Sequence, residues 1–82
     1  MIKRDGFEFR KSTRKNKKYD VFRNNKYVVS FGDKRYQQYK DKIGLYKYLD
    51  HNDSVRRYNY YKRFGIESKP LTAKYFSSHY LW

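Results

Sequence analysis

The side chains in this sequence that most resemble a reactive group surround His51. This histidine follows Asp50 and lies two residues before Asp53. An imidazole beside carboxylates can bind a metal ion or take part in acid–base catalysis. The same run is also typical of a turn leading into a helix, because Asp and Asn side chains accept hydrogen bonds from free backbone N–H groups. The turn is the simpler interpretation.

The remaining sequence offers little else for catalysis. His79 lies among Ser77, Ser78 and Tyr80 without a nearby carboxylate to orient it, which favours a histidine that packs in an interface. The chain has no cysteine, no glycine-rich phosphate loop and no metal-ligand spacing. We therefore predict a protein that is not an enzyme, with no catalytic or metal-binding residues, no cofactor and no small-molecule substrate.

The excess of positive charge is the clearest indication of a partner. Lys and Arg number 21 against 8 Asp and Glu, for a net charge of +13 at pH 7. Such a charge opposes compaction in isolation and is neutralised beside a polyanion. Nucleic acid is the commonest such partner, an acidic protein surface is second, and anionic lipid is third. The alternative is a solvated basic surface that binds nothing.

The predicted polyanion-binding residues occur in two runs of the chain. They are Arg10, Lys11, Arg14, Lys15, Lys17, Lys18, Arg56, Arg57, Lys62 and Arg63. Arginine binds phosphate and carboxylate equally well, so these residues alone do not name the anion. No sequence-specific DNA- or RNA-binding motif is present, so we expect any nucleic acid to be bound nonspecifically through its backbone phosphates.

Residues 1–17 are predicted to form a basic N-terminal arm. The run from Lys11 to Lys18 contains no apolar residue and cannot pack into a core. Phe7 and Phe9 alternate with polar residues as in a strand, and would attach the arm to a neighbouring molecule. The alternative is a mobile, solvated tail.

The next segment predicts a β-hairpin over residues 18–31. Two short runs rich in β-branched and aromatic residues flank Asn24-Asn25, and Asn tolerates the positive φ that a two-residue hairpin turn needs. A hairpin alone is unstable in water, so one of its faces must be covered. We expect the helix at 53–64 to cover it.

That helix has both ends marked in the sequence. Asp53 or Ser54 can cap its N-terminus, and Gly65 can end it in a left-handed conformation. Its predicted buried face consists of residues spaced three to four apart, namely Val55, Tyr58, Tyr61 or Lys62, and Phe64. The opposite face carries the arginines.

The C-terminal segment predicts a second helix over residues 71–80, because Pro70 is tolerated in a first helical turn. The chain then closes on Leu81-Trp82, and so large an apolar ending indicates docking. Residues 40–49 fit either a loop or a helical turn. We therefore predict an α+β fold, with residues 18–82 as a single small domain. The predicted protein interface contains the aromatic and apolar residues near the two ends: Phe7, Phe9, Tyr80, Leu81 and Trp82.

No apolar run reaches membrane-spanning length, and the first residues lack the apolar segment of a signal peptide. We therefore expect no membrane association and a site of action inside a cell or a particle.

One ordered series of motifs resembles a known family. The series comprises Lys18-Tyr19 to Val21, Phe31-Gly32-Asp33, Tyr36 to Tyr39, His51 with Asp53, Arg56-Arg57-Tyr58, Arg63, and Ser78-His79-Tyr80-Leu81-Trp82. It is similar to a family of small basic proteins of unassigned function from large DNA viruses and some tailed phages. This chain departs from the pattern by an insertion around 41–48, by Phe64-Gly65 after the arginine, and by a single closing Trp.

The resemblance implies a viral setting and a non-enzymatic role in the virion. The leading hypothesis is a minor or auxiliary capsid protein, assembled in the host cell interior, that contacts acidic shell proteins or packaged DNA. The alternative is a free, nonspecific nucleic-acid-binding protein that coats or compacts the viral genome. A third hypothesis is a ribosome-type basic protein that folds onto RNA.

Overall fold

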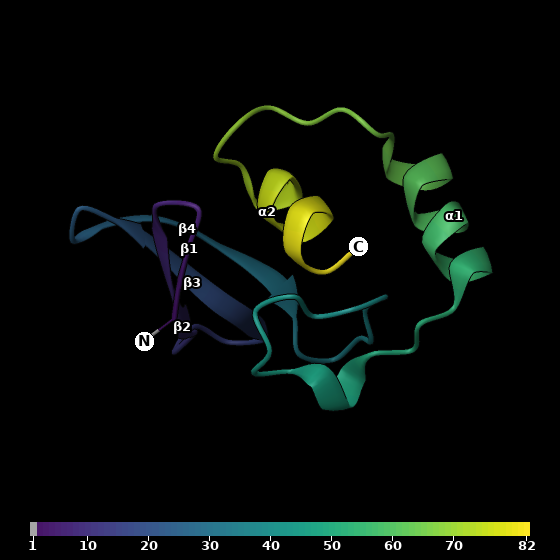
Figure 1. The fold of residues 1–82 in the computed structure, drawn as a ribbon, viewed down its shortest axis with the longest axis horizontal. Coiled ribbons are helices and arrows are strands. Elements are labelled where there is room, and N and C mark those ends of the chain that lie inside the picture. Colours follow the sequence, from purple (N-terminus) through teal and green to yellow (C-terminus); the bar gives the residue numbers. More distant parts are fainter. Residues whose placement is uncertain (1) are drawn as a thin grey trace.

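A four-stranded antiparallel sheet forms the first part of the chain, and two helices form the last (Figure 1). The structure is a computed structural model that describes residues 2–82. Its elements in chain order are β1 (Ile2–Arg4), β2 (Phe7–Lys11), β3 (Lys17–Arg23), β4 (Lys26–Asp33), the 3-10 helix η1 (Lys47–Leu49), α1 (Ser54–Phe64) and α2 (Ala73–Tyr80). The strands lie in the sheet in the order β1-β2-β3-β4. The predicted α+β class is confirmed.

The predicted hairpin corresponds to β3 and β4. Asn24 and Asn25 both adopt positive φ, at 51° and 64°, as a two-residue turn of this kind requires. Val21 pairs with Val29, and a bulge shifts the register before Phe22 pairs with Tyr27. The local chemistry of the turn was enough to predict this part of the sheet.

The N-terminal residues are part of the sheet, and the prediction of a separate arm is wrong for this region. Residues 2–4 and 7–11 are strands β1 and β2, which pair with each other, and β2 pairs with β3. The apolar-free run that suggested an arm is mainly the connection from β2 to β3. The alternation of Phe7 and Phe9 is a true strand pattern, and Phe9 is completely buried. Met1 lies outside the described residues.

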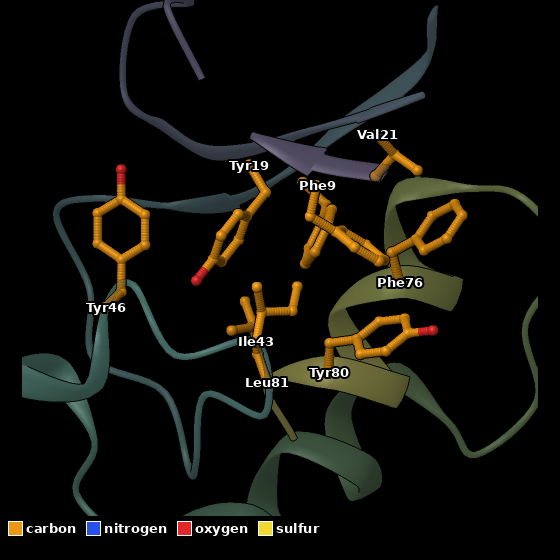
Figure 2. Close-up of a cluster of buried hydrophobic side chains, with 9 residues drawn as sticks. Phe9, Tyr19, Val21, Ile43, Tyr46, Phe76, Tyr80 and Leu81 are labelled. Atoms are coloured by element: carbon orange, nitrogen blue, oxygen red, sulfur yellow. The ribbon is translucent and has the colours of Figure 1, made fainter. Parts of the chain in front are cut away.

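The core lies between one face of the sheet and α2. Figure 2 shows aromatic side chains of the sheet and of α2 pointing toward one another. The buried hydrophobic residues are Phe9, Tyr19, Val21, Phe31, Ile43, Tyr46, Phe76, Tyr80 and Leu81. The ring of Phe76 on α2 stacks on Phe31 at 5.7 Å and meets Phe9 edge-on at 6.2 Å. Edge-to-face and offset-stacked rings therefore make up most of this core.

The expectation that α1 covers the hairpin is wrong. Figure 1 shows α2 between the sheet and α1. Every residue of α1 is described, and none is buried. Val55 and Tyr58, on the predicted buried face, are each 65% exposed, and Phe64 is 52% exposed. The shorter α2 covers the sheet instead: it buries Phe76, Tyr80 and the following Leu81, and it carries one Lys where α1 carries four Lys and Arg.

A buried carboxylate organises residues 40–49. Asp41 accepts hydrogen bonds from the Tyr19 hydroxyl at 2.5 Å and from the backbone N–H groups of Ile43 and Tyr46 at 2.9 and 2.8 Å. The segment is an irregular loop that ends in the single turn of η1. The sequence fitted either a loop or a helical turn here, and the segment contains both. Burial raises the pKa of the Tyr19 hydroxyl, and the bond to Asp41 raises it further.

The two helices begin and end close to where the sequence predicts. The Asp53 side chain accepts from the N–H groups of Val55 and Arg56, and Gly65 ends α1 with φ at 82°. His51 Nδ1 accepts a hydrogen bond from the Asp53 N–H at 2.9 Å. The turn-and-capping interpretation of this run is therefore confirmed. Thr72 caps α2, so this helix starts two residues later than predicted.

Candidate polyanion-binding surface

The carboxylates of this protein are used within the fold. Of the 8 Asp and Glu residues, seven accept a hydrogen bond or form an ion pair with another group of the chain. They are Asp5, Glu8, Asp20, Asp33, Asp41, Asp50 and Asp53. Two of them, Asp20 and Asp41, are buried and accept hydrogen bonds from hydroxyl and backbone N–H groups. The surface that meets solvent is left with a large excess of cations.

Asp20 illustrates how a carboxylate is held inside the sheet. The Ser12 and Ser30 hydroxyls both donate to Asp20 Oδ1, at 2.6 and 2.5 Å. Burial alone would raise the pKa of this carboxyl, but the two hydroxyl bonds outweigh it and the pKa is lowered. Asp20 is therefore ionised, and its charge supports the sheet.

Nine of the ten predicted polyanion-binding residues are exposed, and Lys18 is not. The Lys18 side chain is only 2% exposed, and its ammonium donates to the buried Gln38 side chain. Burial lowers the pKa of Lys18 to about 8, although nearby Asp41 opposes the shift. The prediction that Lys18 meets an external anion is wrong. Its position in β3 turns its side chain toward residues 34–52, the mostly irregular segment between β4 and α1 that contains Gln38; we call this segment the irregular layer. No local sequence pattern could show this orientation.

Two of the exposed cations cover aromatic rings of the sheet. The Arg10 guanidinium lies 4.2 Å from the centre of the Phe22 ring, and that of Arg14 lies 4.6 Å from the centre of the Tyr27 ring. These rings also meet each other edge-on at 5.9 Å. The guanidinium groups therefore have defined positions on the sheet even though they are exposed.

Arg57 serves mainly to hold α1 in place. Its Nε donates to the Trp82 carbonyl oxygen at 2.7 Å, and its guanidinium lies over the rings of Tyr39 and Tyr61. Tyr60 stacks on the Trp82 indole with ring centres 4.4 Å apart and planes at 7°. The Tyr61 hydroxyl donates to the Ser78 carbonyl. α1 is thus attached mainly through the C-terminal residues of the chain.

A groove lies between α1 and the body of the molecule. Its volume is about 790 Å³. Lys17 and Gly32 lie on the sheet side, Arg56 and Arg63 on α1, and Lys74 on α2. Arg56 spans the groove, since its Nη1 donates to the Gln37 side chain at 2.9 Å. The structure therefore brings cations from both predicted runs, together with Lys74, to one concave surface.

One carboxylate lies in this groove and is already paired. Asp33 accepts from Nε and Nη2 of Arg35 at 3.1 and 2.8 Å. This two-pronged contact lowers the pKa of Asp33 to about 2. The groove consequently keeps a positive charge at neutral pH. The sequence analysis did not identify Tyr36 and Lys74 as residues of this groove. For Tyr36, the neighbouring Arg35 could have indicated a binding site, since a cation lies beside an aromatic ring in the sequence.

Most of the predicted protein-interface residues are core residues. Phe9, Tyr80 and Leu81 are buried, so in this fold they are not available to another protein and that prediction is wrong for them. Phe7 is half-buried and meets Phe76 edge-on at 5.1 Å, and Trp82 is half-buried against Tyr60. The large apolar ending does dock, as expected, but onto its own chain.

The exposed apolar residues lie elsewhere, and half of the large ones are in α1 or within two residues of its end. They include Tyr27, Tyr36, Tyr48, Val55, Tyr58, Phe64, Ile66 and Leu71. For Val55, Tyr58 and Phe64 the sequence gave no warning, because their spacing fits a buried helix face as well as an exposed one.

The two histidines have different surroundings. His51 is half-buried, and burial followed by the charge of Arg56 lowers its pKa. Its ring lies 5.2 Å from that of Trp82. His79 is exposed and packs beside Tyr75. Within residues 2–82, no three His, Asp or Glu side chains come together as metal ligands would, and neither helix has the length and apolar character to cross a bilayer.

Comparison with known proteins gives one result. Neither the curated proteins nor the solved structures contain a match to this chain. Residues 7–64 match a family of unknown function, DUF5754, and this match covers well over half of the 82 residues. It begins at β2 and ends with α1, and so contains three of the four strands, the irregular layer and one wall of the groove. The chain belongs to the DUF5754 family.

Proposed function

We propose that this protein is a non-enzymatic structural component of a virus particle, a minor or auxiliary capsid protein. Its cationic surface contacts acidic shell proteins or packaged DNA, and it is assembled in the host cell interior. The viral setting rests on the resemblance described above, to small basic proteins of large DNA viruses and tailed phages.

The distribution of charge is the observation that carries this proposal. Seven carboxylates are used within the fold, whereas nine of the predicted polyanion-binding cations are exposed. The net charge of +13 therefore lies mainly on surface cations, and an anionic assembly would neutralise it.

The apolar side chains around α1 support a protein partner in addition. Val55, Tyr58 and Ile66 are 65%, 65% and 80% exposed. Exposed apolar groups rimmed by polar ones are typical of protein–protein contact surfaces. A shell protein that covers this side of α1 would also hold the helix in place.

A second function is favoured by a different observation. Tyr36 is 64% exposed, and the Arg35 guanidinium lies 5.7 Å from its ring centre. Exposed rings beside cations suit nucleic acid, because phosphates bind the cations and bases stack on the rings. A free protein that coats or compacts a genome is therefore the alternative.

Mass spectrometry of purified full and empty particles tests the proposal. A capsid component is expected in both kinds of particle, with a fixed number of copies per shell. Presence in full particles only, together with duplex DNA binding that weakens steeply with salt, would favour the genome-coating alternative. Absence from both kinds of particle would contradict both functions.

A further inference from the structure

We propose that the groove between α1 and the body of the molecule binds single-stranded nucleic acid. The inference goes beyond the proposed function, since it names a site and a ligand that the purified protein should bind whether or not it occurs in particles.

The walls of the groove supply the phosphate-binding groups. Lys17, Arg56, Arg63 and Lys74 come from three separate elements and line the same space. Asp33 is the one carboxylate among the lining residues, and Arg35 already neutralises it. A strand with regularly spaced phosphates would therefore meet cations along the groove, and no unpaired acidic side chain.

Exposed rings supply the second half of the recognition. Tyr36 lies on the loop side of the groove and Phe64 at the end of α1, and they are 64% and 52% exposed. Each has an arginine beside it: Arg35 at 5.7 Å from the Tyr36 ring and Arg63 at 5.4 Å from the Phe64 ring. Aromatic rings interleaved with cations are the pattern on which unpaired bases stack.

These rings favour a single strand over other anions. The bases of a duplex are already stacked on each other and do not offer their faces to a tyrosine or phenylalanine. An acidic peptide would bind the cations but has no planar groups for the rings. The concave shape, at about 790 Å³, also suits a narrow flexible chain better than a rigid duplex.

The groove contains its own reporter. Trp82 is the single tryptophan of the chain and is one of the residues that line the groove. One face of its indole stacks on Tyr60. A strand in the groove should therefore change the fluorescence of Trp82.

Fluorescence anisotropy of a labelled twelve-nucleotide oligothymidine with the full-length protein tests the proposal. We expect saturable binding, accompanied by a change in Trp82 fluorescence. The matched ligands are a twelve-base-pair duplex and polyglutamate of similar charge, and both should bind more weakly than the oligothymidine at equal salt. Equal or tighter binding of either ligand would overturn the proposal.

Variants of the rings provide the sharpest test. The double variant Tyr36→Ala with Phe64→Ala should weaken oligothymidine binding at least tenfold, since each stacked base contributes roughly 1–3 kcal/mol. The matched control is Tyr48→Ala with Tyr58→Ala, which removes two rings outside the groove that are at least as exposed as Tyr36 and Phe64. All four side chains are exposed, so both variants should fold. An equal loss in both double variants, or no loss in the first, would contradict the proposal.

Charge variants separate the groove from general attraction. Lys17→Gln with Arg63→Gln should reduce the slope of log K against log salt by about 1.4, at about 0.7 for each lost phosphate contact. Lys26→Gln with Lys42→Gln makes the same change of charge at two exposed lysines outside the groove and should leave the slope nearly unchanged. Equal effects of the two pairs would indicate nonspecific attraction and would overturn the site.

The two proposals fail in different ways. A protein present in particles that does not bind oligothymidine would refute the groove and leave the capsid function standing. A protein that binds oligothymidine through the groove but is absent from particles would do the reverse.

Discussion

The sheet with α2 and the helix α1 are held by different kinds of contact. The sheet and α2 share a core of fully buried rings, such as Phe9, Phe31 and Phe76. α1 has no buried residue among its described positions and is attached by a stacked ring pair and a few hydrogen bonds. Yet α1 is the element whose ends and periodicity the sequence marks most clearly. A well-marked amphipathic helix is therefore not necessarily the helix that builds the core.

The last two residues of the chain contact different regions: Leu81 packs with the sheet and α2, and Trp82 packs against α1. Leu81 is buried in the core, whereas Trp82 stacks on Tyr60 and its carbonyl oxygen accepts from Arg57. Because local stability follows buried apolar contact, α1 should open more readily than the sheet. The groove between the two regions would then widen without loss of the core.

Removal of a core ring should have the largest effect. Phe9→Ala should lower the free energy of unfolding by about 3–5 kcal/mol, a large share of the stability of a small domain. Tyr58→Ala, in α1, is the matched change at an exposed ring and should cost about 0.5 kcal/mol or less. Urea unfolding followed by circular dichroism measures both. Similar losses in the two variants would show that α1 is packed as firmly as the sheet.

Loss of the buried carboxylate of Asp41 should have the second-largest effect on stability. Asp41→Ala leaves the Tyr19 hydroxyl and two backbone N–H groups without their acceptor. The expected cost is about 3 kcal/mol, since each buried unpaired polar group costs roughly 1–3 kcal/mol and water can reach part of the loop. The unfolding midpoint in urea should fall accordingly. A change below about 1 kcal/mol would mean that the irregular layer is held by its apolar residues alone.

The buried lysine should make stability depend on pH. The pKa of Lys18 is about 8 in the folded protein and 10.5 when unfolded, so the unfolded chain binds more protons between these values. Lys18 by itself should therefore raise the free energy of unfolding by roughly 2 kcal/mol between pH 8 and pH 10. The tyrosines oppose this rise as the pH approaches 10 and reverse it at higher pH. Burial raises the pKa of Tyr19, Tyr46, Tyr60 and Tyr80 above the ordinary value of tyrosine, so the unfolded chain loses these protons first.

Lys18→Met is the control for this prediction. The variant keeps an unbranched side chain against the core but has no group that titrates at this position, so the rise due to Lys18 should be absent between pH 8 and pH 10 and only the opposing effect of the tyrosines should remain. Equal pH dependence in the variant and the parent protein would assign the effect to the general repulsion among the surface cations.

Loss of the tryptophan should affect α1 alone and should be the smallest effect. Trp82→Ala removes the stacked contact with Tyr60, which contributes roughly 0.5–1.5 kcal/mol beyond its area. Amide hydrogen exchange in residues 54–64 should become about tenfold faster, with little change in the exchange of β3 and β4. Faster exchange throughout the sheet would show that the two regions open together.

Features that depend on neighbouring residues could be predicted from the sequence. The turn at Asn24-Asn25, the cap at Asp53 and the end of α1 at Gly65 all follow from local backbone chemistry, and each was predicted correctly. The α+β class and the docking of the apolar C-terminus followed in the same way. The excess of Lys and Arg over Asp and Glu, also read from composition alone, is the basis of the proposed polyanionic partner, which stays a proposal.

Which surfaces become buried, by contrast, depends on the tertiary fold. The fold placed residues 2–11 in the sheet, put α2 in the position expected for α1, turned Lys18 inward and gathered Lys17, Arg63 and Lys74 around one groove. The physical reason is that burial depends on residues far apart in the chain: β2 is held by β3, and Lys18 lies against Gly32 and Gln38. A strand or a helix shows from its sequence which faces it has, but its partners decide which face meets water.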